Sequence, residues 1–491
     1  MSSPRLVHRV TVPTPIDSLE RYVRARGGRG LVAARVLEPA EIVAIVSESG
    51  LRGRGGAGFP TGRKWQTVLT YHSDVFATTV VVNAAEGEPG TFKDRHMLLT
   101  NPYQVIEGAL IAALAVRAAE IVIGVKHKEE AVWAALRSAV AEIVGAGWSD
   151  GITIRVSAGP DEYLYGEETA LLEVVDGRFP FPRIAPPWRR GVTEVVQADF
   201  DASPASNLSG RVQMAGATDA PPALVDNVET LANVAHILAR GAEWFRTEGT
   251  VDTPGTFVCT ITGDTARAGV GEVIAGTTLR EAIDLIGGGC APGHRIKAVL
   301  GGVSNRVITA DLLDTPITYE DMQSLGIGPG SAGFMVFDET ADMVAVAAGV
   351  SRFLATESCG QCTPCKLDGL SIAERLVRIG NNEATPEDFD SVSHRLRTVA
   401  DGARCFLATQ HQVTVESIME AFADEFAAHR EQVANPITAT LVAELLALAG
   451  SEAVWDEHHL EKQPDWSYDE IWNGESPADR YRDHLLDDHL G

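Results

Sequence analysis

The sequence predicts three successive folded parts: a parallel α/β domain, a smaller α+β domain and a helical C-terminal region. Between residues 78 and 158, short runs of β-branched residues alternate with longer runs of helical period, which is typical of a parallel sheet with crossover helices. From Gly255 the runs become short and turn-separated, with one helical run among them. Beyond Asp342 the pattern is helical to about residue 432. A chain of 491 residues has room for these parts, because a domain typically takes about 100–200 residues.

Helix signals open the chain. Asp17 precedes LERYVRA and Pro39 lies just inside EPAEIVAIVSES, which predicts a capped helix and then a helix with a first-turn proline. We assign residues 1–48 to this helical lead-in and residues 49–250 to the first domain. Within that domain the pattern predicts strands at 78–84, 120–125 and 152–158 and helices at 105–118 and 128–145.

The second domain, residues 256–339, contains the apolar runs TFVCTITG, KAVLGG and GFMVFDE around the helical run TTLREAIDLIGGG. The helical region, residues 342–432, holds four of the six cysteines. Residues 436–491 form an acidic tail whose last 41 positions contain twelve Asp+Glu against three Lys+Arg. Its three tryptophans, Trp455, Trp466 and Trp472, favour a docking segment over a purely solubilising end. Its histidines, His458, His459, His484 and His489, fit a solvated tail better than a metal site.

Composition excludes several classes of protein. A net charge of −26 disfavours binding to nucleic acid or to an anionic membrane surface, since both need a positive field. Six cysteines are too few for a disulfide scaffold. The N-terminal residues do not form an export signal, and the apolar runs are shorter than the ~20 residues that span a bilayer. We therefore expect a cytoplasmic protein with no direct membrane insertion.

The cysteine spacing predicts a metal centre. Cys359, Cys362 and Cys365 form CxxCxxC in ESCGQCTPCK, and Cys405 follows in DGARCFL. Three thiolates at this spacing with a distant fourth favour a 4Fe-4S cluster. A zinc site is the alternative, although zinc ligands usually form two CxxC pairs. Cys259, on an apolar strand, and Cys290, after three glycines, are interpreted as core and turn residues.

A glycine-rich loop, GLRGRGGAGFPTGRKW, spans Gly50 to Trp65. Its formal GxGxxG match is weak, because a helix precedes it where the dinucleotide fingerprint requires a strand. Glycines this close together let a flat or phosphorylated ligand lie against the backbone, and Arg54 and Lys64 can neutralise phosphate. The alternative is a flexible surface loop, which the rigid residues Phe59 and Trp65 disfavour.

Two further segments support a ligand site. NAAEGEPGTFKDR begins at Asn83, where a predicted parallel strand ends and ligands collect. YLYGEETALLE places Glu167 and Glu168 after an aromatic pair. Such carboxylates can accept hydrogen bonds from ribose hydroxyls, or they can simply favour the first turn of a helix.

Taken in order, the glycine loop, NAAEGEPGTFKDR, GEETALLE, DNVETLANV and ESCGQCTPC resemble the NADH-binding flavoprotein subunit of respiratory complex I. They also resemble the diaphorase subunits of NAD-linked hydrogenases and formate dehydrogenases. The resemblance covers about residues 17–432 and implies a Rossmann-like FMN domain, a ubiquitin-like β-grasp (SLBB) domain and a helical bundle that carries the cluster. The residues that would hold FMN by this resemblance are Gly53, Arg54, Gly55, Gly56, Lys64, Asn83, Glu86, Tyr163, Gly166, Glu167, Val225, Asp226 and Asn227.

The resemblance also assigns the remaining sites. NAD(H) would lie against Phe59, Glu88, Glu168 and Trp188, and the cluster would be ligated by Cys359, Cys362, Cys365 and Cys405. A hydride would pass between NAD(H) and FMN, and single electrons between FMN and the cluster, with no catalytic side chain. Implied partners are a thioredoxin-like 2Fe-2S subunit and a larger catalytic or electron-carrying subunit.

The chain departs from the family pattern mainly on the nucleotide side. Ala85 replaces an acidic residue, Thr67 an aromatic one, and Trp188 the last residue of a KPPF motif. Asp226 replaces the first Asn of a pair, and an insertion runs through about residues 199–222. A second hypothesis therefore stays open, in which the chain is an electron-transfer or scaffold subunit that keeps FMN and the cluster but has an altered nucleotide site.

Overall fold

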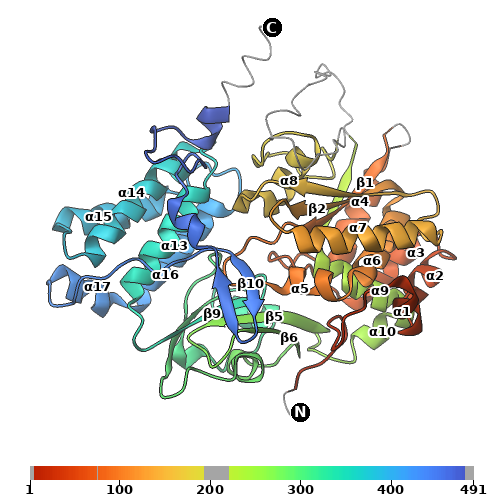
Figure 1. Ribbon diagram of the computed structural model, residues 1–491, viewed down its shortest axis with the longest axis horizontal. Coiled ribbons are helices and arrows are strands. Elements are labelled where there is room, and N and C mark those ends of the chain that lie inside the picture. The colour runs from red at the N-terminus through yellow and green to blue at the C-terminus, as the bar shows by residue number, and fades with distance from the viewer. Residues whose placement is uncertain (1–4, 74–75, 193–220, 482–491) are drawn as a thin grey trace, which may run out of the picture.

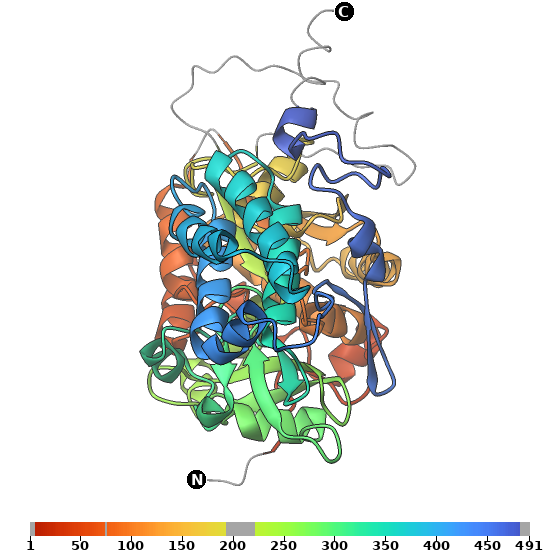
Figure 2. The same cartoon turned by 90° about the vertical axis from the view of Figure 1, so that its left-hand side faces the viewer.

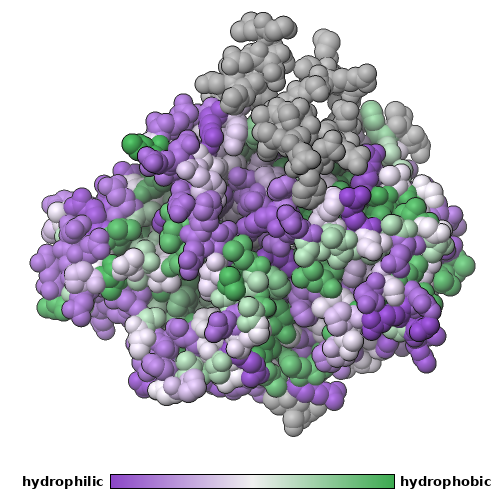
Figure 3. Space-filling view, viewed as in Figure 1, coloured by the Kyte–Doolittle hydropathy of each residue, from purple (hydrophilic) through white to green (hydrophobic). Residues whose placement is uncertain are grey.

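Three regions of the chain lie side by side in the computed structural model, which describes residues 5–73, 76–192 and 221–481 (Figure 1). The first domain is at the right in this view, the second domain below it, and the C-terminal helices at the left. Nearly all of the insertion expected at 199–222 lies outside the described residues. Hydrophilic residues cover most of the helical region on this face (Figure 3), in keeping with the large net negative charge.

A four-stranded parallel sheet forms the centre of the first domain. Its strands are β1 (Thr78–Ala84), β2 (Ala118–Lys126), β3 (Thr153–Gly159) and β4 (Ala223–Asn227), in the order β3-β2-β1-β4. The chain proceeds outward from β1 to β3 and then returns to pair β4 with the other side of β1. The direction of winding thus reverses between β1 and β4, and ligands bind at the carboxyl ends of the strands at such a point. Asn83 and Asn227 lie opposite each other there.

Helices cover both faces of this sheet. Val80 and Val82 pack into a core with α6 and α9, whereas Val81 faces Leu171 and Leu172 of α8. This two-sided burial explains why β1 is a continuous apolar run rather than an alternating one. The helices of the domain are α4 (Thr61–Thr70), α5 (Lys93–Thr100), α6 (Pro102–Val116), α7 (Glu130–Gly145), η1 (Tyr163–Gly166), α8 (Glu168–Val175), α9 (Val228–Arg240) and α10 (Ala242–Phe245).

The predicted strands and helices of this domain are confirmed, and β1 has the predicted bounds. The helical lead-in contains three helices rather than two: α1 (Leu19–Arg24), α2 (Arg29–Ala34) and α3 (Pro39–Ser49). Pro39 begins α3 as predicted. Ser18, not Asp17, caps α1: the Ser18 hydroxyl accepts the Arg21 amide, while Asp17 pairs with the Arg21 guanidinium.

The contact between α6 and α9 leaves no room for a side chain at Gly108. A Cβ added there would lie 1.9 Å from the carbonyl oxygen of Leu231, which is backbone and cannot rotate away. We expect Gly108→Ala to destabilise the first domain by about 1–3 kcal/mol, as overpacking does. Gly145→Ala is the matched control, since no atom lies within 4 Å of its Cβ position. Thermal unfolding of both variants checks this, and equal stability of the two would contradict it.

The second domain contains a five-stranded mixed sheet in the order β6-β5-β9-β7-β8. Central strands β5 and β9 pair in parallel, and the other pairs are antiparallel. The strands are β5 (Thr256–Gly263), β6 (Gly269–Ile274), β7 (Ile296–Leu300), β8 (Ile308–Thr309) and β9 (Gly333–Asp338). The predicted helical run forms α11 (Leu279–Ala282) and the π-helical turn η3 (Ile283–Gly287). The structure adds η4 (Ala310–Leu312) and α12 (Tyr319–Ser324), which the prediction of a single helix missed.

The helical region is confirmed as helical and shares one apolar core with the second domain, through residues such as Leu300 and Met335, and with Leu164 of the first domain. Its helices are α13 (Met343–Glu357), α14 (Thr363–Gly380), α15 (Pro386–Thr398), α16 (Leu407–Ala421) and α17 (Ala423–Arg430). None of the helices in the described parts of the chain combines the length and the apolar character needed to cross a membrane.

The acidic C-terminal segment, over its described residues, packs against the body. It forms the hairpin β10 (Leu445–Ala449) and β11 (Glu452–Trp455), followed by η5 (Glu457–Glu461). The expectation that its histidines are solvated is wrong for His459, which is 7% exposed because it pairs with buried Glu357. Trp466 is likewise buried, whereas His484 and His489 lie outside the described residues.

Candidate functional site

A cavity of about 790 Å³ lies where the three regions meet. It adjoins the carboxyl ends of β1 and β4, and the second domain and the start of α16 complete its wall. Its volume lies within the ~300–1,000 Å³ typical of small-molecule sites. The predicted ligand-binding residues that line it are Gly55, Gly56, Asn83, Glu86, Glu88, Tyr163, Gly166, Glu167, Glu168 and Asn227.

The glycine loop presents bare backbone to this cavity. Gly56 has φ +128°, and no atom lies within 4 Å of its Cβ position. A Cβ on Gly55 would come within 3.1 Å of Asn227. The loop is held closed because the Gly53 amide donates to Phe59 O at 2.8 Å. Its open side can therefore receive a flat ring, as the sequence predicts.

Arg54 does not face the cavity, contrary to its predicted place at FMN. Its guanidinium is buried under the loop, where Nε donates to Thr256 O at 3.2 Å and Nη1 to Tyr319 Oη at 3.1 Å. It also stacks 4.2 Å from the Phe257 ring centroid. The N–H groups of Arg54 thus donate to carbonyl and hydroxyl oxygens of the second domain, and not to a phosphate as predicted. Arg54 ties the glycine loop to β5.

Several other predicted residues also lie outside the cavity lining. Lys64 pairs with Glu168 and lies 3.8 Å from Asp226, whose other oxygen accepts Trp65 Nε1–H at 2.6 Å. Burial raises the pKa of Asp226 to about 6 despite this lysine. Val225 is buried in the sheet core, and Trp188 packs against the core of the first domain. Gly53 is used in closing the loop, and Phe59 is 47% exposed beside Arg63.

Lys93 is a cationic lining residue that the sequence interpretation missed. Its Nζ lies 2.8 Å from Asp94 and 2.9 Å from Glu229, and the side chain is 1% exposed. Burial alone would lower the pKa of Lys93, but the two carboxylates raise it, so the group stays charged. Lys93 lies in TFKDR, ten residues after Asn83 and in the same segment that the sequence analysis predicts at the ligand, so it could have been found. Other lining residues that were missed are Thr91, Asp94, Ser304, Asn305, Ser331 and Gln410.

The two predicted glutamates after β1 are both held by the protein. Glu86 accepts the amides of Asp94 and Arg95 at 3.1 and 3.3 Å and pairs with Arg95 Nε at 3.0 Å. Glu88 accepts Val303 N–H at 2.7 Å and Tyr163 Oη–H at 2.6 Å. Burial raises the pKa of Glu88. Glu88 therefore joins the first domain to the second while lining the cavity.

The four predicted cluster cysteines come together around a small void that adjoins the large cavity. Cys359, Cys362, Cys365 and Cys405 all line it, and Cys405 and Leu164 line both spaces. Among the described residues, no three of these Sγ atoms lie within 4.8 Å of one another. Zn–S bonds of ~2.3 Å would bring thiolates to about 3.8 Å apart. The cysteines are thus not gathered as a single zinc ion would hold them, and the arrangement is compatible with a cluster that has one iron per cysteine.

The four thiols lie among hydrogen-bonding groups, and burial raises the pKa of several of them. Ser358 Oγ lies 3.2 Å from Cys365 Sγ, and Gln361 Nε2 donates to Cys359 Sγ at 3.5 Å. Burial raises the pKa of Cys365 to about 11 and that of Cys405 to about 12. Thiolate ligation must therefore release protons as the metal binds.

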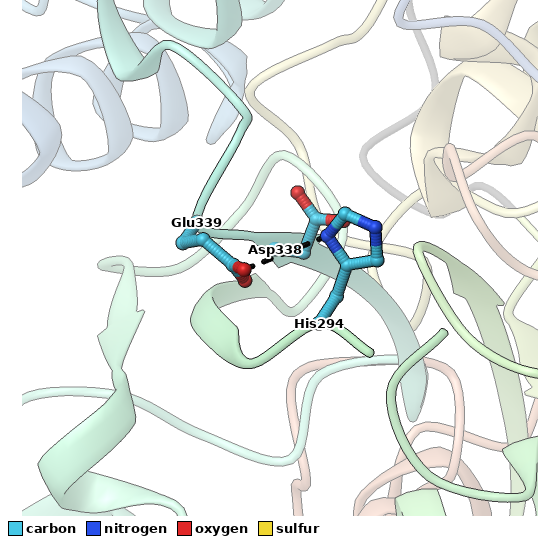
Figure 4. A group of neighbouring side chains, drawn as sticks. All are labelled: His294, Asp338 and Glu339. Atoms are coloured by element: carbon cyan, nitrogen blue, oxygen red, sulfur yellow. Dashed lines mark ion pairs between the residues drawn. The ribbon is translucent and has the colours of Figure 1, made fainter. Parts of the chain in front are cut away.

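A separate polar group lies in the second domain (Figure 4). His294 Nδ1 is 3.1 Å from Asp338 and 3.5 Å from Glu339. Asp338 also accepts the amide and hydroxyl of Thr340, and Glu339 accepts the Arg295 amide. Contacts among neighbouring protein groups therefore explain why these three side chains lie together. None of the three residues lines the cavity.

Comparisons with known proteins agree with this arrangement. Residues 46–236 match the family model for the Nuo51 FMN-binding domain, and residues 345–429 match that for the NADH-ubiquinone oxidoreductase-F iron-sulfur binding region. The chain is 35% identical to the NADH-quinone oxidoreductase F subunit of Streptomyces coelicolor over 84% of this chain and 88% of that protein. It is equally identical to the NADP-reducing hydrogenase subunit HndC of Solidesulfovibrio fructosivorans, over 84% of this chain and 81% of that protein.

Among solved structures, the chain resembles one from the crystal structure of NAD+-reducing [NiFe]-hydrogenase in the H2-reduced state. The TM-score is 0.71 at 29% identity, and the match covers 84% of this chain and 66% of that chain. The matched family regions contain the parallel sheet and the four cysteines. They also contain the residues that line the cavity, except those of its second-domain wall. The chain therefore belongs to the family of NADH-quinone oxidoreductase F subunits and the related hydrogenase flavoprotein subunits.

Proposed function

We propose that the chain is the flavoprotein (diaphorase) subunit of a multisubunit oxidoreductase. It passes a hydride between NAD(H) and FMN, and single electrons between FMN and a 4Fe-4S cluster. The observation that carries this function is that Cys405 and Leu164 line both the large cavity and the cysteine void. A flavin in the cavity would thus lie beside a cluster ligand.

The residues present suit FMN and a nicotinamide nucleotide. The backbone of Gly55 and Gly56 leaves space for a ring, Asn83 and Asn227 supply amides, and Lys93 supplies positive charge. FMN supplies the exchange between a two-electron hydride and single electrons. The side chains would bind and orient the two ligands, and hydride transfer between them requires no acid or nucleophile.

The finer domain assignments rest on topology. We assign the second domain to the β-grasp (SLBB) class, supported by the parallel pair of β5 and β9 at the centre of the mixed sheet. We assign α13–α17 to a cluster-bearing bundle, supported by Cys365 on α14 and by Cys405 two residues before α16. A cytoplasmic location is supported by the six unpaired cysteines, since disulfides are rare in that compartment.

Partner subunits are proposed because a single cluster needs an outlet for electrons. After four ligands only Cys259 and Cys290 remain, and Cys259 is buried in β5. This chain therefore has too few thiols for a second cluster. A thioredoxin-like 2Fe-2S subunit and a larger catalytic or electron-carrying subunit are the proposed partners.

The second candidate function is electron transfer without efficient use of NAD(H). Two observations on the residues predicted to contact NAD(H) favour it. Phe59 and Trp188 do not line the cavity, and Ala85 stands in place of the family's acidic residue. Anaerobic titration separates the two functions. NADH is expected to bleach the FMN absorbance of the purified protein, and dithionite shows the full extent of bleaching.

If dithionite bleaches the FMN but NADH does not, the diaphorase function is ruled out and the second candidate remains. Parallel titration with NADPH tests the predicted roles of Glu88 and Glu168. Carboxylates beside the ribose would repel the 2′-phosphate of NADPH, so equal bleaching by both nucleotides would contradict these roles. Gly56→Leu, which fills the open side of the loop, should lower FMN content. Gly147→Leu is the matched control, since Gly147 also has positive φ and open space but lies outside the cavity lining.

A further inference from the structure

The C-terminal segment is a folded feature that lies beyond the iron-sulfur family model. The iron-sulfur family model ends at residue 429, whereas the structure continues to Tyr481. We call residues 442–481 the C-terminal strap. It runs along the outside of the body in both views, with the β10–β11 hairpin at one end and its last helical turn near α8 at the other (Figures 1 and 2).

The first attachment of the strap is to the first domain. Glu444 pairs with Lys126, at the end of β2, and with Lys128 at 2.9 Å. Lys126 is fully buried, so the strap supplies the carboxylate that neutralises it. The guanidinium of Arg95 donates to Leu445 O. The strap thus completes charged contacts that begin in the wall of the flavin cavity.

The second attachment is to Glu357, the last residue of α13. One of its oxygens accepts His459 Nε2–H at 2.9 Å and Lys462 Nζ–H at 2.7 Å, and the other accepts the Tyr163 amide at 2.9 Å. The Glu357 side chain is 2% exposed, so its charge is met by the strap and not by solvent. The strap therefore stabilises the carboxylate that joins Tyr163, a cavity residue, to the helix before the cysteine loop.

The third attachment covers the cysteine loop itself. The Ala478 amide donates to Cys359 O at 2.9 Å, and Ser476 packs so closely on Gly360 that a Cβ there would lie 2.3 Å away. Trp466 Nε1 donates to Thr356 O at 3.0 Å. Beside these contacts Tyr481 stacks on Phe179, with ring centroids 3.9 Å apart. With the strap in place Cys359 is only 7% exposed.

We propose that the C-terminal strap is a built-in cover of the iron-sulfur site, which holds the CxxCxxC loop against the flavin-cavity wall and keeps dissolved chelators and oxidants from the cluster. The strap has three separate attachments on two domains, and lifting it from two of them would leave buried charges without their partners, which is costly. An exposed cluster loses iron to chelators. If a cover must open first, the loss is slower, and the more stable the cover the smaller the fraction of molecules that are open.

The test measures iron release from the full-length holoprotein to a ferrous-iron chelator under anaerobic conditions. In Trp466→Ala we expect release about tenfold faster than in the wild type, because a buried ring and its hydrogen bond are lost where the strap meets the cluster domain. Trp472→Ala is the matched control, since the Trp472 Nε1–H donates only within the strap, to Glu475 O. A chain lacking residues 465–491 should release iron at least as fast as Trp466→Ala.

Equal release from wild type, Trp466→Ala and the shortened chain would overturn the proposal. Equal acceleration in Trp466→Ala and Trp472→Ala would overturn it too, because it would indicate general loosening. FMN content and the thermal midpoint of flavin release report the fold, and both should stay at wild-type values in Trp466→Ala. The proposal rests on the cluster assignment, which the starting iron content tests separately: wild-type protein without iron contradicts the cofactor and not the cover.

Discussion

Replacing Cys405 with serine is expected to abolish the iron-sulfur cluster while the protein keeps FMN. Cys405 is the proposed fourth ligand, and most of helix α14 and all of α15 lie between it and Cys365. It lines the same void as the other three because α16, which begins two residues later, packs on α13, α14 and α15. A serine hydroxyl is a poor substitute for thiolate in such a site, so the expected result is loss of most of the bound iron and sulfide.

The measurement is iron and acid-labile sulfide per chain, together with the EPR signal of the dithionite-reduced protein. Flavin absorbance should remain, and anaerobic NADH should still bleach it, because the glycine loop and β1 are unchanged. Cys290→Ser is the matched control, since Cys290 lies in a turn of the second domain and lines neither the void nor the cavity. A Cys405→Ser protein with a wild-type EPR signal would show that another group ligates the fourth iron.

Sequence patterns predicted the parts of the fold that depend on local periodicity. The bounds of strand β1 are predicted correctly because TTVVVNA is a short β-branched run that a longer run of helical period follows. The four cysteines were assigned together because their spacing limits the possible metal centres. In both cases the signal lies within a short stretch of chain or within a recognised motif.

Side-chain direction and long-range pairing could not be predicted in the same way. Arg54 stands between two glycines of the ligand loop, yet its guanidinium turns toward Thr256, about 200 positions away, because the second domain offers carbonyls there. The tryptophans of the strap favour a docking segment, but no local pattern shows which residues its charges meet. Its carboxylate at Glu444 finds Lys126, 318 positions earlier, and only the folded chain brings the two together.

Glu229→Gln is expected to destabilise the first domain by about 3 kcal/mol and to lower its FMN content. Glu229 is fully buried on α9, with Lys93 Nζ at 2.9 Å, the Val258 amide at 3.0 Å and Arg54 Nε at 3.9 Å. It neutralises the cation that lines the cavity and the guanidinium that anchors the glycine loop. Glutamine keeps the volume but leaves two buried cations with one carboxylate, Asp94, beside Lys93.

Because the chain has several domains, the appropriate readout is the denaturant midpoint of flavin release, accompanied by FMN per chain after purification. Glu243→Gln is the control: Glu243 is exposed on α10, and its loss should change the free energy of unfolding by no more than about 0.5 kcal/mol. Adding Lys93→Gln to Glu229→Gln should recover part of the lost stability, since the double variant no longer buries Lys93 with too little negative charge. If Glu229→Gln alone keeps wild-type stability and FMN, Asp94 suffices for Lys93, and Glu229 does not link the loop to the cavity wall.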